Sequence, residues 1–347
     1  MPRVPASPPE TAAGSVVAAL RGLSPRTVGI LAAGVTLVVW TAFIVIARGS
    51  AARTLSAFDL AFVRVCGASL ILLPWGYAIV RGLRRTDPGA GSLFGLSPLP
   101  LRITLITGAL GGVAYAVLAY AGFFFAPAAH ASVLLPGSLP LWTAIMAAVL
   151  LHDRITPARA AGLALIVAGD LLVGGSSLLH AFAGGEVWKG DLLFMGAAFC
   201  WGCYGVLARR HGLDAVRATI AITAFAFFTY VPVYLLLLAG GALASHLGAA
   251  PWGEIGFQLL FQGVGSVVVS GISFTRMIQY FGPVRSTMIT AVVPGSSALA
   301  AVFFLGEPLY WNLVAGLLLV TAGILFGVFG AAAARKPAPV TCPDAAA

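Results

Sequence analysis

Long apolar runs separated by short polar breaks fill the chain from residue 27 to residue 330. A helix needs about 20 mainly apolar residues to cross the hydrocarbon core of a bilayer. Ten runs have that length: 27–47, 57–80, 103–125, 127–151, 158–178, 190–208, 217–239, 254–275, 285–305 and 309–330. The pattern therefore predicts an all-α integral membrane protein with ten transmembrane helices.

One apolar stretch occurs twice. Pro140 aligns with Pro294 and Asp153 with Glu307, so an acidic residue lies in a short polar break between two apolar runs in both places. The starts of the copies also agree, as WTAFIVIAR at 40–48 and WGCYGVLAR at 201–209. We predict four parts: an N-terminal tail (1–26), a first five-helix repeat (27–178), a second five-helix repeat (190–330) and a C-terminal tail (331–347). Repeats in so apolar a chain are typical of membrane transporters.

Composition excludes a soluble protein and a nucleic-acid partner. Only 9% of the 347 residues are charged and 60% are hydrophobic, with a mean hydropathy of +0.99, whereas soluble domains carry about 25% charged residues. The net charge of +9 is spread over the gaps between apolar runs instead of forming a basic stripe. No residue pattern indicates a cofactor, a metal or an enzyme active site, and Cys200 and Cys203 lie in an apolar run without a second ligand pair.

The basic residues predict the orientation. If the N-terminus is cytosolic, sixteen of the 20 Lys and Arg residues lie in cytosolic segments and three, Arg48, Arg53 and Lys189, in outer ones. This bias follows the positive-inside rule, so both termini are expected in the cytosol. Because each repeat has an odd number of spans, the second repeat must enter the membrane inverted. The fold is then two inverted-topology repeats, with a binding site expected near the midplane between them.

Several motifs in this order carry a family resemblance. They are WTAFIVIAR with FDLAFVR at 58–64, AAHASVLLPGSLPL at 128–141, GDLLFMGAAFCWGCYGVLARR at 190–210 and LGEPL at 305–309. Over roughly residues 28–330 the chain resembles the EamA family of the drug/metabolite transporter superfamily. The resemblance implies a carrier that moves small metabolites, commonly outward, through a cavity lined by the first, third, fourth, sixth, eighth and ninth helices. The first repeat has HDR at 152–154 where the family favours GE, although Asp153 keeps the acid.

Arg64 is the basic residue that lies well inside a predicted span, away from both of its ends. Inserting an arginine there costs about 2.5–3.5 kcal/mol, so it must face protein or water and find a partner. Asp170 lies at a similar depth in the fifth span, and Asp59 is a competing partner nearer the interface. We predict an Arg64–Asp170 ion pair, with a structural role and a functional role both open. His130 opens the fourth span and either couples transport to protons or caps a helix end.

Polar and aromatic residues repeat on single helical faces, as the lining of a water-filled cavity requires. The predicted substrate-binding residues are Trp40, Tyr115, Pro136, Trp201, Tyr204, Gln258, Gln262, Ser266 and Pro294. The alternative for the small polar residues is ordinary helix packing. The prolines are expected to kink their helices near the midplane.

We therefore expect a secondary transporter that exports a small amphiphilic metabolite, amino-acid-like or drug-like, by alternating access in a bacterial inner membrane. An uncoupled facilitator is the alternative, and a membrane-embedded lipid enzyme is less favoured. The expected partners are the metabolite, the lipid bilayer and protons as a candidate coupling ion. A monomer and a homodimer are both open.

Overall fold

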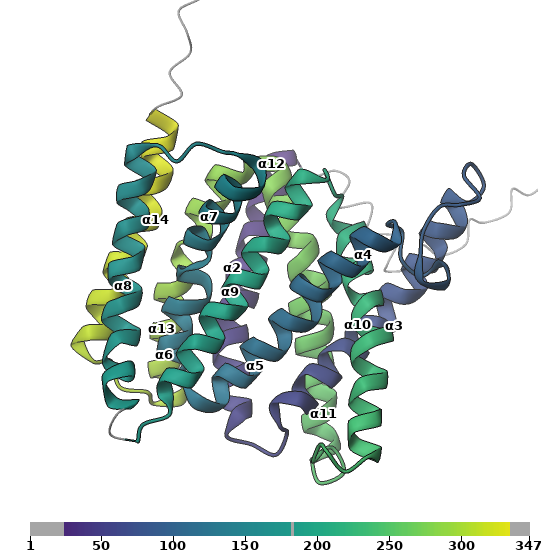
Figure 1. Ribbon diagram of the computed structural model, residues 1–347, viewed down its shortest axis with the longest axis horizontal. Helices are drawn as coiled ribbons and strands as arrows, with labels where there is room; N and C mark the ends of the chain where they lie inside the picture. The colour runs from purple at the N-terminus through teal and green to yellow at the C-terminus, as the bar shows by residue number, and fades with distance from the viewer. Residues whose placement is uncertain (1–23, 182–183, 334–347) are drawn as a thin grey trace, which may run out of the picture.

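A computed structural model describes residues 24–181 and 184–333 (Figure 1). Helices account for most of these residues, and an isolated bridge between Ser92 and Ser97 is the nearest approach to a sheet within the described ranges. An unpaired backbone group in hydrocarbon costs several kcal/mol, and a helix satisfies its backbone internally. The apolar sequence therefore forms a bundle of helices.

The first half of the bundle ends at residue 181. Its elements are α2 (Pro25–Ala51), α3 (Ala57–Leu83), the short 3-10 turn η1 (Leu93–Gly95), α4 (Leu101–Gly108), η2 (Ala109–Ala114), α5 (Tyr115–Phe125), α6 (Ala128–Ser132), η3 (Val133–Gly137), α7 (Leu139–Leu151) and α8 (Pro157–Ala181). The second half comprises α9 (Val187–Arg210), α10 (Ala215–Ala239), α11 (Trp252–Gln258), η4 (Leu259–Val269), α12 (Ser270–Thr290), α13 (Val292–Leu305) and α14 (Trp311–Ala333). The segments η2, η3 and η4 are π-helical and continue the α-helices on either side.

Eight helices among the described residues are long and apolar enough to cross a membrane, and α13 and α14 supply shorter apolar stretches. The predicted spans agree with the observed helices except around the eighth and ninth. There α12 continues through residues 276–284, where the sequence predicted a break between two spans. That segment holds a single charged residue, Arg276, which is too weak a polar break to end a helix. The break falls instead at Ala291, three residues before Pro294.

Glycines let α8 and α14 pack closely along one edge of the bundle (Figure 1). A Cβ atom on Gly162 would lie 2.6 Å from the carbonyl oxygen of Gly323, and one on Gly169 would lie 2.7 Å from that of Gly316. In the sequence repeat, Gly162 corresponds to Gly316 and Gly169 to Gly323. The two close approaches are therefore equivalent when the repeats are exchanged.

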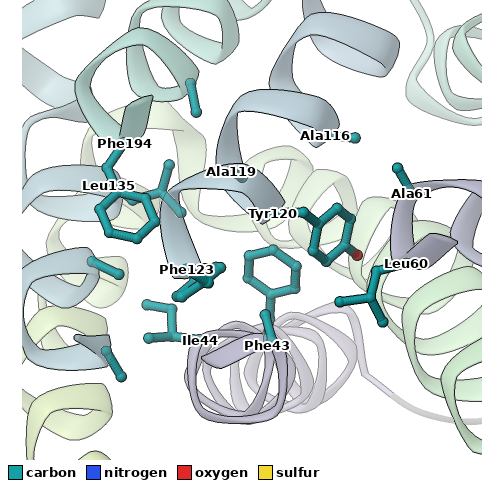
Figure 2. Close-up of a cluster of buried hydrophobic side chains, with 14 of the residues drawn as sticks. Phe43, Ile44, Leu60, Ala61, Ala116, Ala119, Tyr120, Phe123, Leu135 and Phe194 are labelled. Carbon is teal, nitrogen blue, oxygen red and sulfur yellow. The ribbon is translucent and has the colours of Figure 1, made fainter. Parts of the chain in front are cut away.

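Figure 2 shows the main core, where the rings of Phe43, Tyr120 and Phe123 lie side by side. The centre of the Phe43 ring lies 5.9 Å from that of Tyr120 and 6.0 Å from that of Phe123, and both contacts are edge-on. The same cluster reaches Ala126 and Ala128 near the ends of α5 and α6. This core joins helices from both halves of the chain.

Asp59 belongs to the start of α3. It forms a capping box with Ser56, whose hydroxyl accepts from the Asp59 amide at 3.2 Å while the Asp59 carboxylate accepts from the Ser56 amide at 3.0 Å. The carboxylate also accepts from the hydroxyls of Tyr234 and Ser245 and from the backbone amide of His246. It thus ties α10 and the following loop to α3 and is unavailable to Arg64.

Candidate functional site

A cavity lies at the centre of the bundle, next to the main core. Its lining residues are Trp40, Phe43, Ile44, Arg64, Tyr115, Leu135, Pro136, Leu139, Ala198, Trp201, Ser266, Ser270 and Val293. They come from α2, α3, α5, η3, α7, α9, η4, α12 and α13, so both halves of the chain contribute. The lining is mostly apolar and aromatic with a few polar groups, which is the composition of a small-molecule site.

Arg64 brings a positive charge to this cavity. Its Nη1 atom donates to the Ser266 hydroxyl at 2.8 Å and lies 3.4 Å from the Tyr120 hydroxyl. The guanidinium carbon is 5.7 Å from the centre of the Phe43 ring, within the range of a cation–π contact. Among the described residues no acidic side chain lines the cavity. The charge is held by neutral dipoles and an aromatic face.

The predicted Arg64–Asp170 ion pair is wrong. α3 packs against η4, α10 and α5, whereas α8 packs mainly against α14. Asp170 is 7% exposed, and neither carboxylate oxygen has a hydrogen-bond partner. The two residues were matched by depth alone, and depth does not determine which helices are neighbours.

Aromatic side chains form one wall of the cavity. Trp40 donates its indole N–H to the Ser270 hydroxyl at 2.8 Å and packs against Phe274 at 5.0 Å between ring centres. Tyr115 and Trp201 lie 4.8 Å apart. These contacts fix the orientations of large rings that can cover an apolar ligand.

Six of the predicted residues line the cavity: Trp40, Arg64, Tyr115, Pro136, Trp201 and Ser266. Tyr204 packs behind Trp201, with ring centres 5.1 Å apart. Pro294 is buried beside the lining residue Val293. Pro136 lies in η3, the π-helical segment between α6 and α7.

The two glutamines lie outside the lining. Gln262 is fully buried and accepts from the Tyr120 hydroxyl at 2.9 Å, which links it indirectly to Arg64. Gln258 donates to the Ser50 hydroxyl at 2.6 Å. Each amide keeps one buried polar atom without a partner, the oxygen of Gln258 and the nitrogen of Gln262. Both glutamines therefore connect η4 and its flanking helix to neighbouring helices.

His130 is also absent from the lining. It is 9% exposed, and its Nδ1 atom lies 2.8 Å from an Asp191 oxygen. Asp191 belongs to the GDLLF motif, whose sequence did not indicate a role for this residue. The pair joins α6 to the start of α9.

Two ion pairs join the halves at opposite ends of the bundle. Arg48 Nε lies 3.2 Å from a Glu307 oxygen, and Arg209 Nη2 lies 2.5 Å from an Asp153 oxygen. In the repeat Arg48 corresponds to Arg209 and Glu307 to Asp153. The two acids were evident from the sequence repeat, whereas their arginine partners were not.

Glu307 has further contacts at its end of the bundle. Its carboxylate accepts from the backbone amides of Ala128 and Ala129, each at 3.1 Å. Arg48 donates to the Phe123 carbonyl at 2.6 Å. These contacts hold the segment between α13 and α14 against the start of α6, next to the main core.

Two segments of the chain match one known protein family. The model of the EamA-like transporter family matches residues 27–175 and again residues 188–329. The chain belongs to the EamA-like transporter family. It is therefore an integral membrane transporter and not an enzyme.

Individual EamA relatives are distant. The chain is 25% identical to the uncharacterized transporter YyaM of Bacillus subtilis over 231 residues, covering 64% of this chain and 71% of YyaM. It is 25% identical over 287 residues to a Salmonella typhimurium protein named "Probable amino-acid metabolite efflux pump", covering 76% of this chain and 94% of that protein. A solved crystal structure matches with a TM-score of 0.55 at 20% identity, covering 89% of this chain and 99% of the other, which supports the fold.

Proposed function

We propose that the protein is a secondary transporter that exports a small amphiphilic metabolite by alternating access. The observation that carries the proposal is the central cavity, whose lining comes from both family-matched segments. The named efflux pump among the relatives supports the outward direction and a metabolite cargo. The proposed location is a bacterial inner membrane, and the distribution of the basic residues supports cytosolic termini.

Alternating access needs two halves that can rock against each other around the site. We propose that these are inverted five-helix repeats, within ten spans in all. Two observations support an internal twofold relation: the equivalent glycine contacts of α8 with α14 and the equivalent ion pairs at the two ends. In a twofold interface, each contact recurs with the partners exchanged.

The ion pairs suggest how each end is held. The Arg48–Glu307 pair would close the outer end and the Arg209–Asp153 pair the cytosolic end. The first is the more buried, with side-chain exposures of 32% and 13% against 56% and 38%. Exposed pairs contribute little, so the cytosolic end would open more easily in the conformation described.

Counterflow tests the proposal. Metabolite profiling of medium from cells with and without the protein would nominate a cargo, and liposomes would then be loaded with the unlabelled compound. A carrier accumulates external label transiently by exchange, whereas an uncoupled facilitator does not. Trp40→Leu should abolish exchange, while Trp252→Leu, at a tryptophan that is 88% exposed, should not. Flux without counterflow would favour the facilitator.

A further inference from the structure

Arg64 has capacity to bind beyond its protein contacts. A guanidinium carries five N–H donors in a planar fork, and the protein contacts of Arg64 use Nη1 alone. Its Nε and Nη2 atoms have no hydrogen-bond partner in residues 24–181 and 184–333. Neither atom is among the unpaired polar atoms that are inaccessible to solvent. The remaining donors therefore face the cavity that Arg64 lines.

The charge of Arg64 is also unbalanced. Of the buried carboxylates in the described spans, Asp59 is committed to the start of α3 and Asp191 contacts His130. Asp170 accepts no hydrogen bond at all, from Arg64 or any other group. An arginine inside a membrane pairs with an anion or a dipole, and here the protein supplies only hydroxyl dipoles and the Phe43 ring.

We propose that the cavity selects an organic anion, a small molecule with one carboxylate on an apolar or aromatic body, and that Arg64 binds the carboxylate. This rests on the proposed transport function and names its substrate class. An Arg fork matches a carboxylate through two parallel hydrogen bonds. The body of the molecule lies against the rings of Trp40, Tyr115 and Trp201.

The lining also disfavours a free ammonium group. A cation meets Arg64 with no acid nearby to balance it. The Ser266 and Ser270 hydroxyls already accept from Arg64 and from Trp40. A carboxylic acid that has no amino group, or whose amino group is acylated, fits this lining better than a zwitterionic amino acid does.

The test uses four probes that share one skeleton and differ in charge. They are N-acetyl-phenylalanine (anion), phenylalanine (zwitterion), phenylalanine amide (cation) and N-acetyl-phenylalanine amide (neutral). Liposomes with the full chain are loaded with labelled N-acetyl-phenylalanine, and each unlabelled probe is added outside. We expect the anion to stimulate exchange at least about tenfold more than the other three, the scale of a hydrogen bond to a charged group.

Variants then assign that preference to Arg64. Arg64→Gln should cut the ratio of anion to neutral exchange by about 10- to 100-fold, and Arg64→Lys should keep a weaker preference of the same sign. Arg53→Gln, at an exposed arginine, should leave the ratio unchanged. Because the readout is a ratio, a smaller amount of folded variant does not alter it. If Arg64→Gln does not insert, Arg64→Lys and the wild-type ratio still decide.

Equal exchange of the neutral or cationic probe by the wild type would overturn the anion proposal and leave transport intact. An Arg64→Gln protein that keeps the full anion preference would overturn the role of Arg64. If the wild type exchanges none of the four probes, the proposal fails. The counterflow assay with the profiled metabolite decides separately whether the transport function also fails.

Discussion

Glu307 offers the sharpest test of how the transporter closes. Its carboxylate accepts three N–H groups, from Arg48 at 3.2 Å and from the amides of Ala128 and Ala129 at 3.1 Å each. Glu307→Gln keeps the shape but removes the charge and turns an N–H₂ group toward one of these donors. A hydrogen bond to a charged group exceeds a neutral one by about 1 kcal/mol. Three such bonds, discounted because Arg48 is partly exposed, give a loss of about 2–3 kcal/mol.

In the proposed alternating-access cycle that loss falls on the outward-closed state, so the equilibrium constant for outward opening should rise about 30- to 150-fold, at 1.36 kcal/mol per factor of ten. Asp153→Asn weakens a single exposed contact with Arg209. Such pairs are worth about 0.2–1 kcal/mol, so opening of the cytosolic end should change at most about fivefold. We therefore predict that Glu307→Gln changes opening much more than Asp153→Asn does, although the two acids occupy equivalent positions in the repeat.

Thiol labelling measures it. Leu139→Cys places a thiol in the cavity lining of a chain whose four native cysteines have been replaced. A membrane-impermeant maleimide added from outside then reports the outward-open fraction as an initial rate. Glu186→Gln is the matched control, because it removes an ion pair with Lys189 that is local to the start of α9 and should not change the rate. If Glu307→Gln labels no faster than the control, the ion pair does not hold the outer end closed.

Three further predictions follow from the packing. Asp170→Ile introduces the residue found at the equivalent position of the second repeat and should raise the melting temperature, because it removes a buried carboxylate that accepts no hydrogen bond. A lower melting temperature would contradict this. Tyr120→Phe should lower the free energy of unfolding in detergent by about 1–3 kcal/mol, since the Gln262 oxygen loses its donor. An unchanged unfolding midpoint would show that another group donates to this oxygen. Gly162→Ala should reduce the folded yield, because its Cβ would meet the Gly323 oxygen at 2.6 Å, and equal yield would mean that α8 and α14 can separate.

The sequence by itself determined the helices and the family. Apolar runs of sufficient length must be helical in hydrocarbon because each backbone N–H and C=O must be satisfied locally. The alignment of Asp153 with Glu307 was likewise available from the chain alone. The same reasoning failed at residues 276–284, where a single arginine did not end α12. Hydropathy is summed along the chain and therefore predicts spans better than turns.

The tertiary structure decided the partners. The sequence predicts similar membrane depths for Arg64 and Asp170, yet the two residues belong to helices with different neighbours. Arg64 therefore faces a cavity, whereas Asp170 lies without a hydrogen-bond partner. Glu307 looked like a turn residue and instead reaches Arg48 and the start of α6. A side chain's partner depends on the rotation of its helix about the axis and on which helix packs there. Neither quantity is encoded locally, because both arise only when distant helices assemble.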